Sequence, residues 1–290
     1  MAVNNASPVK SKKELAKQLG VSRQSLYYQP KLPGKDLLLK SEIERVMIAH
    51  KRYGHKRIAW EMNINKKRVR RVMKLFGLKP KRSRKLPSKP QDFNQAPMTI
   101  PNLLKEMLID APNIAWANDF TYLPYFGSFV YLSTTEDLFT REIIGFAVST
   151  KHDANLVIAS TMHALKNHPA PHVSHSDQGS EYRSIRYQRA LLVAGITSSM
   201  SEKASPWQNG HQEGFYSEFK LELGHPEAYP TLGELIEAIA LQIHYYNHQR
   251  IHTALKCPPV AFAEKFKLQK ISKIAEKKLT FQNTPNELSV

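Results

Sequence analysis

Hydrophobic and polar positions follow two different periods along the chain. Beyond about residue 110, short apolar segments rich in β-branched and aromatic residues lie at 114–123, 129–137 and 143–149, and turn-forming stretches separate them. Such segments predict three consecutive strands. Helical and strand patterns then alternate over 153–167, 172–176, 180–194, 195–201, 211–223 and 231–249. Three strands followed by alternating helices and strands predict an α/β layer with a mixed sheet.

The first third of the chain has helical spacing instead. Ser11 and Glu14 have the spacing of a capping box, and Gly20 suits the turn between two helices. Ser22 then precedes a second predicted helix, which carries near its start the polar residues Arg23, Gln24 and Ser25. A helix-turn-helix presents its DNA-reading side chains at that place, so we favour DNA binding over an ordinary helical hairpin.

A second helical region spans 36–78. Its pattern predicts a helix over 37–51 and two more helices that are separated by a turn near Asn63 and Asn65. The last helix has an apolar stripe formed by Val69, Val72, Met73 and Phe76. Its other faces are basic and carry Lys66, Lys67, Arg68, Arg70, Arg71 and Lys74. Solvated helix faces normally mix both signs of charge. No acidic residue lies between 63 and 77, which favours a helix that lies against DNA phosphates.

Prolines among basic and polar residues mark 79–101 as an extended linker, because proline removes backbone donors and stiffens the chain. Together with the change of period, this linker predicts five segments. They are a first helix-turn-helix at 1–34, a second basic helix-turn-helix-like domain at 35–78, a proline-rich basic linker at 79–109, an α/β core at 110–268 and a polar tail at 269–290.

The net charge of +17 comes entirely from the helical third and the linker. Residues 1–95 carry 25 Lys and Arg against 6 Asp and Glu, whereas residues 96–290 carry 17 against 19. A basic patch can bind nucleic acid or an anionic membrane, or can serve solubility alone. Here the basic residues are interleaved with helical apolar positions, which favours nucleic acid as the partner.

Cysteine content and hydropathy indicate the cellular compartment. Cys257 is the only cysteine, which excludes an internal disulfide and a cysteine-rich zinc site. No apolar run approaches the roughly 20 residues that span a bilayer, and the polar first residues lack a signal-peptide core. We therefore expect a cytoplasmic protein without a membrane partner.

Three carboxylates are the candidate chemical groups. Asp119 lies within the first predicted strand, Asp177 directly follows a short strand, and Glu213 lies in the first turn of a predicted helix. That helix has an apolar face, which is expected to anchor it to the sheet and consists of Phe215, Tyr216, Phe219 and Leu223. A carboxylate within a buried strand is costly unless a cation compensates it. Taken singly, each also has an ordinary explanation as a cap, a turn residue or a partner of the helix dipole.

The motifs around these acids resemble those of insertion-sequence transposases whose catalytic core is similar to retroviral integrases. Asp119 lies in WANDFTY, Asp177 in HSDQGSEY and Glu213 in SPWQNGHQEGF, with 35 residues between Asp177 and Glu213. Lys220 matches a basic residue of the family, and YYNHQRIHTALKCPPVAF matches a later stretch of its cores. The resemblance is to the second-reading-frame type of a bacterial two-frame element. SPWQNG departs from the Tyr-Asp-Asn-Ala stretch of many such members, which leaves the subgroup open.

The resemblance implies a ribonuclease-H-like core with a five-stranded mixed sheet and a DDE transposase that cleaves DNA and transfers strands. Two Mg²⁺ ions, or Mn²⁺ in their place, would lie about 3.5–4 Å apart. Asp119 would bridge them, while Asp177 and Glu213 would each hold one. Lys220 would contact DNA phosphate, and Trp207 and Asn209 are further candidate DNA contacts beside Glu213.

The partners that the resemblance implies are double-stranded DNA at the terminal repeats and at the target, and further copies of the chain in a homo-oligomer. An upstream reading-frame product is a possible additional partner, and the protein would associate with the bacterial nucleoid when bound to DNA. Two other functions stay open: a catalytically silent DNA-binding regulator, and a simple metal-dependent nuclease. A zinc site on His244, His248 and His252 is a less favoured alternative, because hydrogen-bonding residues lie among them.

Overall fold

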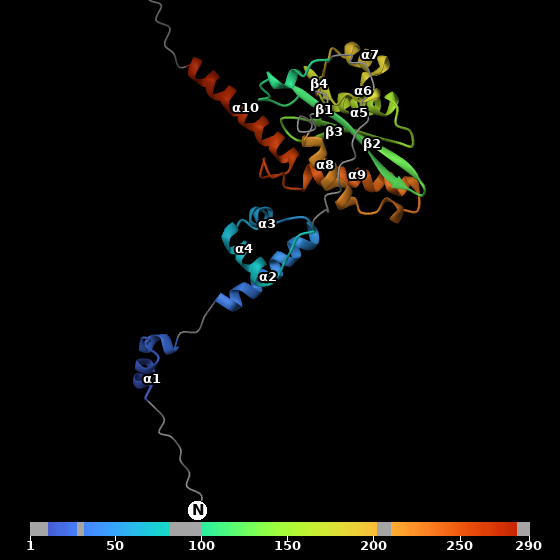
Figure 1. Cartoon of the computed structure of the whole chain (residues 1–290). Helices are drawn as coiled ribbons and strands as arrows, with labels where there is room; N and C mark the ends of the chain where they lie inside the picture. Colours follow the sequence, from blue (N-terminus) through green and yellow to red (C-terminus); the bar gives the residue numbers. More distant parts are fainter. Residues whose placement is uncertain (1–10, 28–31, 82–99, 202–209, 283–290) are drawn as a thin grey trace, which may run out of the picture. The chain divides into compact units, whose positions relative to one another are not determined.

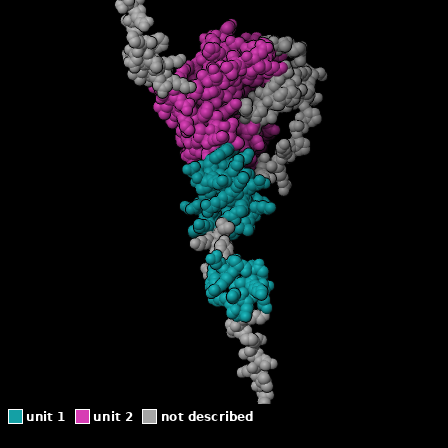
Figure 2. Space-filling view, turned by 90° about the vertical axis from the view of Figure 1, so that its left-hand side faces the viewer, with its two compact units in different colours: residues 1–49, 53–79 teal, residues 50–52, 80–290 magenta. Residues whose placement is uncertain are grey.

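The computed structural model describes residues 11–27, 32–81, 100–201 and 210–282. The chain divides into two compact units, which Figure 2 colours separately. Unit 1 comprises residues 1–49 and 53–79, and unit 2 comprises residues 50–52 and 80–290. The short segment 50–52 therefore belongs with the second unit, although unit 1 residues flank it on both sides in the sequence.

Unit 1 begins with helix α1 (Lys12–Gln18) and a short 3-10 helix, η1 (Arg23–Tyr27). The capping box is confirmed, because Ser11 accepts from the backbone of Glu14 and the Glu14 carboxylate accepts from the backbone of Ser11. The second predicted helix is a 3-10 helix of five residues. The backbone N–H of Ser25 bonds to the carbonyl of Ser22, which is the tighter i to i+3 pattern.

The rest of unit 1 contains helices α2 (Leu32–Ala49), α3 (His55–Glu61) and α4 (Lys66–Leu75). Asn63 has a φ of 50° and makes the predicted turn between α3 and α4, and Asn65 caps α4 by accepting from Lys67. The apolar stripe of α4 packs inward. The buried apolar residues of these helices are Leu39, Ile43, Ile58, Ala59, Val69, Val72 and Met73, and Tyr53 between α2 and α3 is buried as well.

Unit 2 is built on the predicted mixed sheet of five strands (Figure 1). The strands are β1 (Ala115–Tyr125), β2 (Ser128–Asp137), β3 (Ile143–Ser149), β4 (Val173–Ser176) and β5 (Thr197–Met200). Their order is β3-β2-β1-β4-β5; the first three are antiparallel neighbours, and β4 and β5 continue the sheet in parallel with β1. Phe126 and Gly127, both with positive φ, form the tight turn between β1 and β2.

Helices cover both faces of this sheet, because alternate residues of a strand point to opposite faces. Leu123 of β1 packs in a cluster with α8 (Gly210–Leu223) and α9 (Leu232–His248). Phe120 packs on the other side, in a cluster with α5 (Ala154–Asn167), α6 (Ser180–Arg183) and α7 (Ile185–Val193). Gly145 of β3 lets α5 approach closely, since a Cβ there would lie 2.3 Å from the carbonyl oxygen of Ser160.

Several boundaries differ from those expected. The single helix predicted at 180–194 is interrupted at Ser184, whose side chain caps α7 by accepting from Tyr187. Helix α10 (Pro259–Gln282) continues beyond 269, where a polar tail was expected. Within the linker range, residues 103–105 form the short helix η2 (Leu103–Lys105), whereas 82–99 lie outside the described residues. A further short helix, η4 (Pro226–Ala228), precedes α9.

Candidate active site

Asp119 and Asp177 are brought together by two neighbouring parallel strands. The register of β1 and β4 pairs Ala117 with His175, and each aspartate lies two residues further along its own chain segment. Residues two apart in extended chain point to the same face, and neighbouring strands lie about 4.8 Å apart. The two carboxylates are 58 positions apart in the sequence. The fold thus places them at equivalent positions along two neighbouring strands, where β4 ends beside β1.

Asp119 is half-buried in the middle of β1, where it pairs with Thr134 of β2. Its Oδ1 accepts from the backbone N–H of Phe120 at 2.8 Å. Its main-chain carbonyl accepts a hydrogen bond from the hydroxyl of Tyr216, also at 2.8 Å. Tyr216 belongs to α8, so the strand that carries Asp119 is tied directly to that helix.

Asp177 occupies the turn after β4. Its Oδ1 accepts from the backbone N–H of Gly179 at 2.9 Å. Burial raises the pKa of this carboxyl, the Gly179 hydrogen bond opposes that shift, and the nearby Glu181 adds to it. A bound cation would favour the ionised form, so a buried acid of this kind is a suitable metal ligand.

Tyr182 is a polar residue beside the two aspartates that the sequence analysis did not single out. Its side chain is fully buried, and its hydroxyl has no hydrogen-bond partner among the described residues. Burial, followed by the negative charge of Asp119 and then by the effects of Tyr216, Asp177 and Tyr187, holds its pKa well above the ordinary value. The phenol therefore stays protonated and can donate a hydrogen bond toward the acids. Its place in HSDQGSEY is the only sequence signal that could have found it.

Glu213 lies in helix α8, three residues after the helix begins at Gly210, as the sequence predicted for a first-turn position. The structure does not describe the side chain of Glu213, and the predicted DNA contacts Trp207 and Asn209 lie outside the described residues. The predicted apolar face of this helix is confirmed, because Phe215, Tyr216, Phe219 and Leu223 are all buried.

Lys220 lies further along α8, on the side near Asp119. Its Nζ lies 4.8 Å from the centre of the Tyr122 ring, which is a cation–π contact. Burial lowers the pKa of this lysine, and the attraction of Asp119 opposes that shift. A partly desolvated ammonium beside an acidic site is suited to attract a phosphate.

The candidate DNA contacts of unit 1 are exposed on its two basic elements. Arg23, Gln24 and Ser25 are exposed on η1, and the exposed residues of α4 include Lys66, Lys67, Arg68, Arg70 and Lys74. Arg71 is also exposed, but its guanidinium forms two hydrogen bonds with the buried Asp36, at 2.5 and 2.7 Å. That pair lowers the pKa of Asp36 and raises that of Arg71.

The donor set at the sheet edge fits a hard divalent cation. Asp119 and Asp177 follow paired residues of two neighbouring strands, and the buried hydroxyl of Tyr182 beside them has no partner within the described part of the chain. In that part, no three His, Cys, Asp or Glu side chains form a metal-holding group by themselves. The side chain of Glu213 lies outside the described part of the chain, and magnesium keeps several waters when few protein ligands are present.

The sequence and the site match one family. The integrase core domain family matches residues 110–206, and a second integrase core domain family matches residues 194–259. A transposase for insertion sequence element IS904 from Lactococcus lactis is 37% identical over 230 residues, covering 75% of this chain and 90% of the relative. A putative transposase, InsK for element IS150 from Escherichia coli, is 32% identical over 255 residues, covering 84% and 89%. The chain belongs to the insertion-sequence transposases with an integrase core. This transposase is accordingly a DNA-cutting and DNA-joining protein of transposition and DNA integration.

Solved integrase cores are also similar to the catalytic unit of this transposase. The catalytic core of BIV integrase has a TM-score of 0.44 and 17% identity, and covers 55% of this chain and 99% of that core. The HTLV-2 integrase core, solved in complex with magnesium, has a TM-score of 0.41 and 18% identity, and covers 53% and 98%. Among the described helices of the transposase, none is long and apolar enough to cross a membrane.

Proposed function

We propose that this transposase binds the terminal repeats of its element and performs Mg²⁺-dependent DNA cleavage and strand transfer with Asp119, Asp177 and Glu213. The observation that carries the proposal is the parallel register of β1 and β4, which aligns Asp119 with Asp177. Glu213 lies in α8, and the hydroxyl of Tyr216 ties that helix to the carbonyl of Asp119. All three acids therefore belong to elements that are directly connected.

Asp119, Asp177 and Glu213 would hold the metal through their carboxylate oxygens. When bound, a pair of Mg²⁺ or Mn²⁺ ions would help to activate the attacking oxygen and to stabilise the leaving oxygen. Lys220 would attract the DNA phosphate toward the acids, because its ammonium lies on the Asp119 side of α8. The buried Tyr182 hydroxyl would donate a hydrogen bond to a carboxylate or to a water between the acids, which orients the metal ligands.

Unit 1 would supply the affinity for duplex DNA. The basic face of α4 carries several exposed cations and the helix contains no acid, so phosphate contacts are its natural use. Arg23, Gln24 and Ser25 on η1 would reach base edges. Pairing of two element ends by a homo-oligomer, and cooperation with an upstream reading-frame product, complete the proposal.

A joining assay with a precut end tests the catalytic part. The full chain is incubated with a short element-end duplex carrying a free 3′-OH, a supercoiled target plasmid, and Mg²⁺ or Mn²⁺. We expect the wild type to give joined product, and Asp119→Asn or Asp177→Asn to lower the joining rate at least about a hundredfold. Both variants should still bind the end duplex in a gel-shift assay. Asp110→Asn, which changes an exposed aspartate outside the site, is the matched control and should join normally.

Two other results would overturn the proposal. Plasmid degradation without a joined product, abolished by the same substitutions, would indicate a nuclease. Unchanged plasmid with the wild type and with both variants, together with normal DNA binding, would indicate a catalytically silent regulator.

A further inference from the structure

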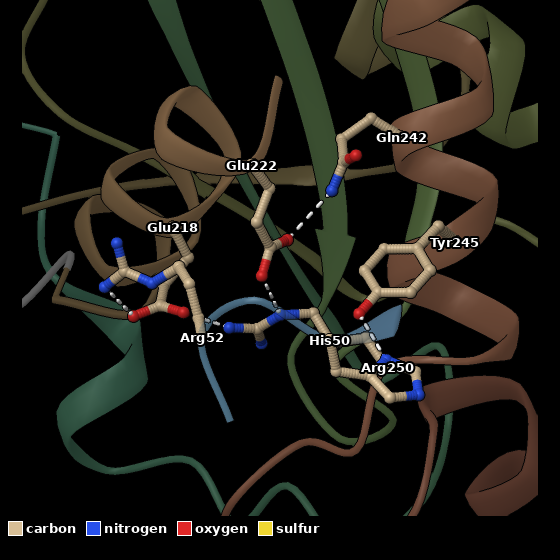
Figure 3. Close-up of polar contacts among 7 residues, drawn as sticks. All are labelled: His50, Arg52, Glu218, Glu222, Gln242, Tyr245 and Arg250. Carbon is tan, nitrogen blue, oxygen red and sulfur yellow. Dashed lines mark hydrogen bonds and ion pairs between the residues drawn. The ribbon is translucent and has the colours of Figure 1, made fainter. Parts of the chain in front are cut away.

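A compact group of charged side chains contacts helix α8 (Figure 3). It consists of Glu218 and Glu222 of α8, Arg250 after α9, and Arg52 from the segment 50–52. All four residues belong to unit 2. We call this group the α8 charge cluster. Nothing in the proposed chemistry uses it directly.

Arg250 is the centre of the cluster. Its side chain is 3% exposed, its Nε donates to Glu222 at 2.9 Å, and its Nη2 donates to Glu218. The pKa of Arg250 is raised by both glutamates against the opposing effect of burial. Glu222 also accepts from the side-chain amide of Gln242 in α9 at 2.8 Å. One guanidinium thus bridges two carboxylates that are one helical turn apart.

Arg52 supplies the second positive charge. Its Nη2 donates to Glu218 at 2.7 Å, and its side chain is only 11% exposed. The neighbouring His50 contacts α9 through a hydrogen bond of 2.7 Å between its Nδ1 and the hydroxyl of Tyr245, and the two rings are stacked. The carbonyl of Lys51 accepts from the backbone N–H of Lys81 at 3.0 Å. His50 and Arg52 therefore contact helices α9 and α8 of unit 2, and Lys51 bonds to the backbone of Lys81.

Charge balance shows why Arg52 matters to α8 in particular. Arg250 alone would face two carboxylates, and Arg52 brings the cluster to two positive and two negative charges. Largely buried charges are costly when a partner is removed, because the remaining charge is poorly solvated. The apolar face of α8 would remain buried without Arg52. Losing Arg52 should therefore loosen the orientation of the helix rather than dismantle the core.

The orientation of α8 is what the acidic site depends on. Positions 213 and 222 lie about half a turn apart around an ideal helix, so the cluster holds α8 from the side opposite the site. Tyr216 of the same helix bonds to the carbonyl of Asp119. We propose that Arg52 is a positioning residue for catalysis: it holds α8 so that Glu213 meets Asp119 and Asp177. This inference rests on the proposed metal-dependent function.

The test compares full-length Arg52→Gln and Arg52→Lys with the wild type in two measurements. The first is the joining rate as a function of Mg²⁺ concentration. We expect the half-saturating Mg²⁺ concentration to rise about three- to tenfold for Arg52→Gln, because a misplaced Glu213 weakens metal binding. Arg52→Lys keeps the charge but loses the forked donor geometry, and should give an intermediate shift. Arg189→Gln, on an exposed arginine of α7, is the matched control and should leave the curve unchanged.

The second measurement is amide hydrogen exchange of the metal-free protein. We expect faster exchange in peptides from α8 of Arg52→Gln, with β1 and β4 unchanged. If Arg52→Gln does not fold, the shift with Arg52→Lys decides the matter.

A lower melting temperature with an unchanged Mg²⁺ half-saturation and unchanged α8 exchange would overturn the inference, since that result describes a purely structural arginine. Unchanged behaviour in all measurements would overturn it as well. If the wild type never joins DNA but Arg52→Gln still speeds amide exchange in α8, the proposed function is wrong and the positioning contact is retained.

Discussion

The hydroxyl of Tyr216 donates a hydrogen bond to the main-chain carbonyl of Asp119 at 2.8 Å. The same hydroxyl lies 2.8 Å from the Oγ1 of Thr134 in β2, so it is held from two strands. Tyr216 is three residues after Glu213 in the same helix. One phenol therefore connects the helix of the third proposed acid to the strand of the first, at the residue where precise spacing matters most.

Replacing Tyr216 with phenylalanine should affect both stability and joining. Loss of the buried hydrogen bond to the Asp119 carbonyl should lower the free energy of unfolding by about 1 kcal/mol. The joining rate should fall about tenfold or more, because α8 is no longer held to Asp119. Urea unfolding and the precut-end assay measure the two effects.

Tyr229→Phe is the control for that change. Tyr229 donates to the carbonyl of Leu223 at 3.2 Å, at the other end of α8 and away from the acids. It should lower stability to a similar degree and leave the joining rate near that of the wild type. Equal loss of joining in both variants would show that the Tyr216 contact has no special relation to the site.

Gly145→Ala should destabilise unit 2 strongly. The added Cβ would lie 2.3 Å from the carbonyl oxygen of Ser160 and 2.7 Å from the backbone nitrogen of Ala164, and neither backbone atom can move away easily. We expect a loss of about 2–3 kcal/mol in the free energy of unfolding, as for other overpacked cores. Gly233→Ala in α9 is the control. Its Cβ would meet only the Thr231 hydroxyl, at 3.9 Å, so stability should be equal or slightly greater. Equal behaviour of both variants in thermal unfolding would contradict the close approach of α5 to β3.

Glu136 should make the stability of unit 2 depend on pH. Burial raises the pKa of this carboxyl to about 7, against the attraction of Arg141, whose Nη1 lies 3.7 Å away. The folded state therefore binds a proton more tightly than the unfolded state. The stability that this proton contributes is fully present below the ordinary pKa of glutamate and is lost as the pH rises through about 7.

Glu136→Gln should remove that dependence. Between about pH 4.5 and pH 8, the wild type should lose up to about 3 kcal/mol relative to the variant, measured by urea unfolding at each pH. Glu237→Gln, on an exposed residue of α9, should track the wild type at every pH. Parallel curves for Glu136→Gln and the wild type would show that Glu136 has an ordinary pKa.

Arg70 and Arg71 should separate DNA binding from folding in unit 1. Arg70 is exposed on α4, and Arg70→Ala should weaken binding of the element end and reduce the slope of log affinity against log salt by about one. Arg71→Ala should lower the melting temperature of unit 1 instead, because it removes both hydrogen bonds to the buried Asp36.

The salt titration also tests the role of unit 1 as a whole. With 6–10 phosphate contacts, the affinity of the wild type should fall about 10³–10⁵-fold between 50 and 200 mM salt. A flat salt response, or identical effects of the two arginine variants, would contradict the assignment of α4 to DNA phosphates.

Local pattern was enough to predict the strands and most helices of the catalytic unit. The apolar segment at 114–123 placed Asp119 within a strand, the short strand at 172–176 placed Asp177 directly after it, and family spacing added Glu213. The break at Ser184 was missed because the apolar spacing continues through it, although a serine at that place can cap a helix. Helix α10 was not predicted because it begins at the second of two successive prolines and its later part is polar.

Contacts between distant parts of the chain could not be predicted in the same way. Arg52 looks like one of many cations in a basic region, and only the fold brings it to Glu218, 166 positions away. The Tyr216 hydroxyl was expected only as part of an apolar face. The hydrogen-bond partner of a buried tyrosine hydroxyl is set by tertiary packing, and helical periodicity does not predict it.

Because residues 50–52 pack with unit 2, this unit of the transposase is formed from two separate stretches of the sequence. An expression fragment cut in the linker and starting at residue 100 would contain every proposed acid, yet it would leave Glu218 without the guanidinium that reaches it from upstream. Such a fragment should join DNA more slowly than the full chain, although all three proposed acids are present. A peptide that spans residues 50–52, added in trans or fused ahead of residue 100, is then the component to restore.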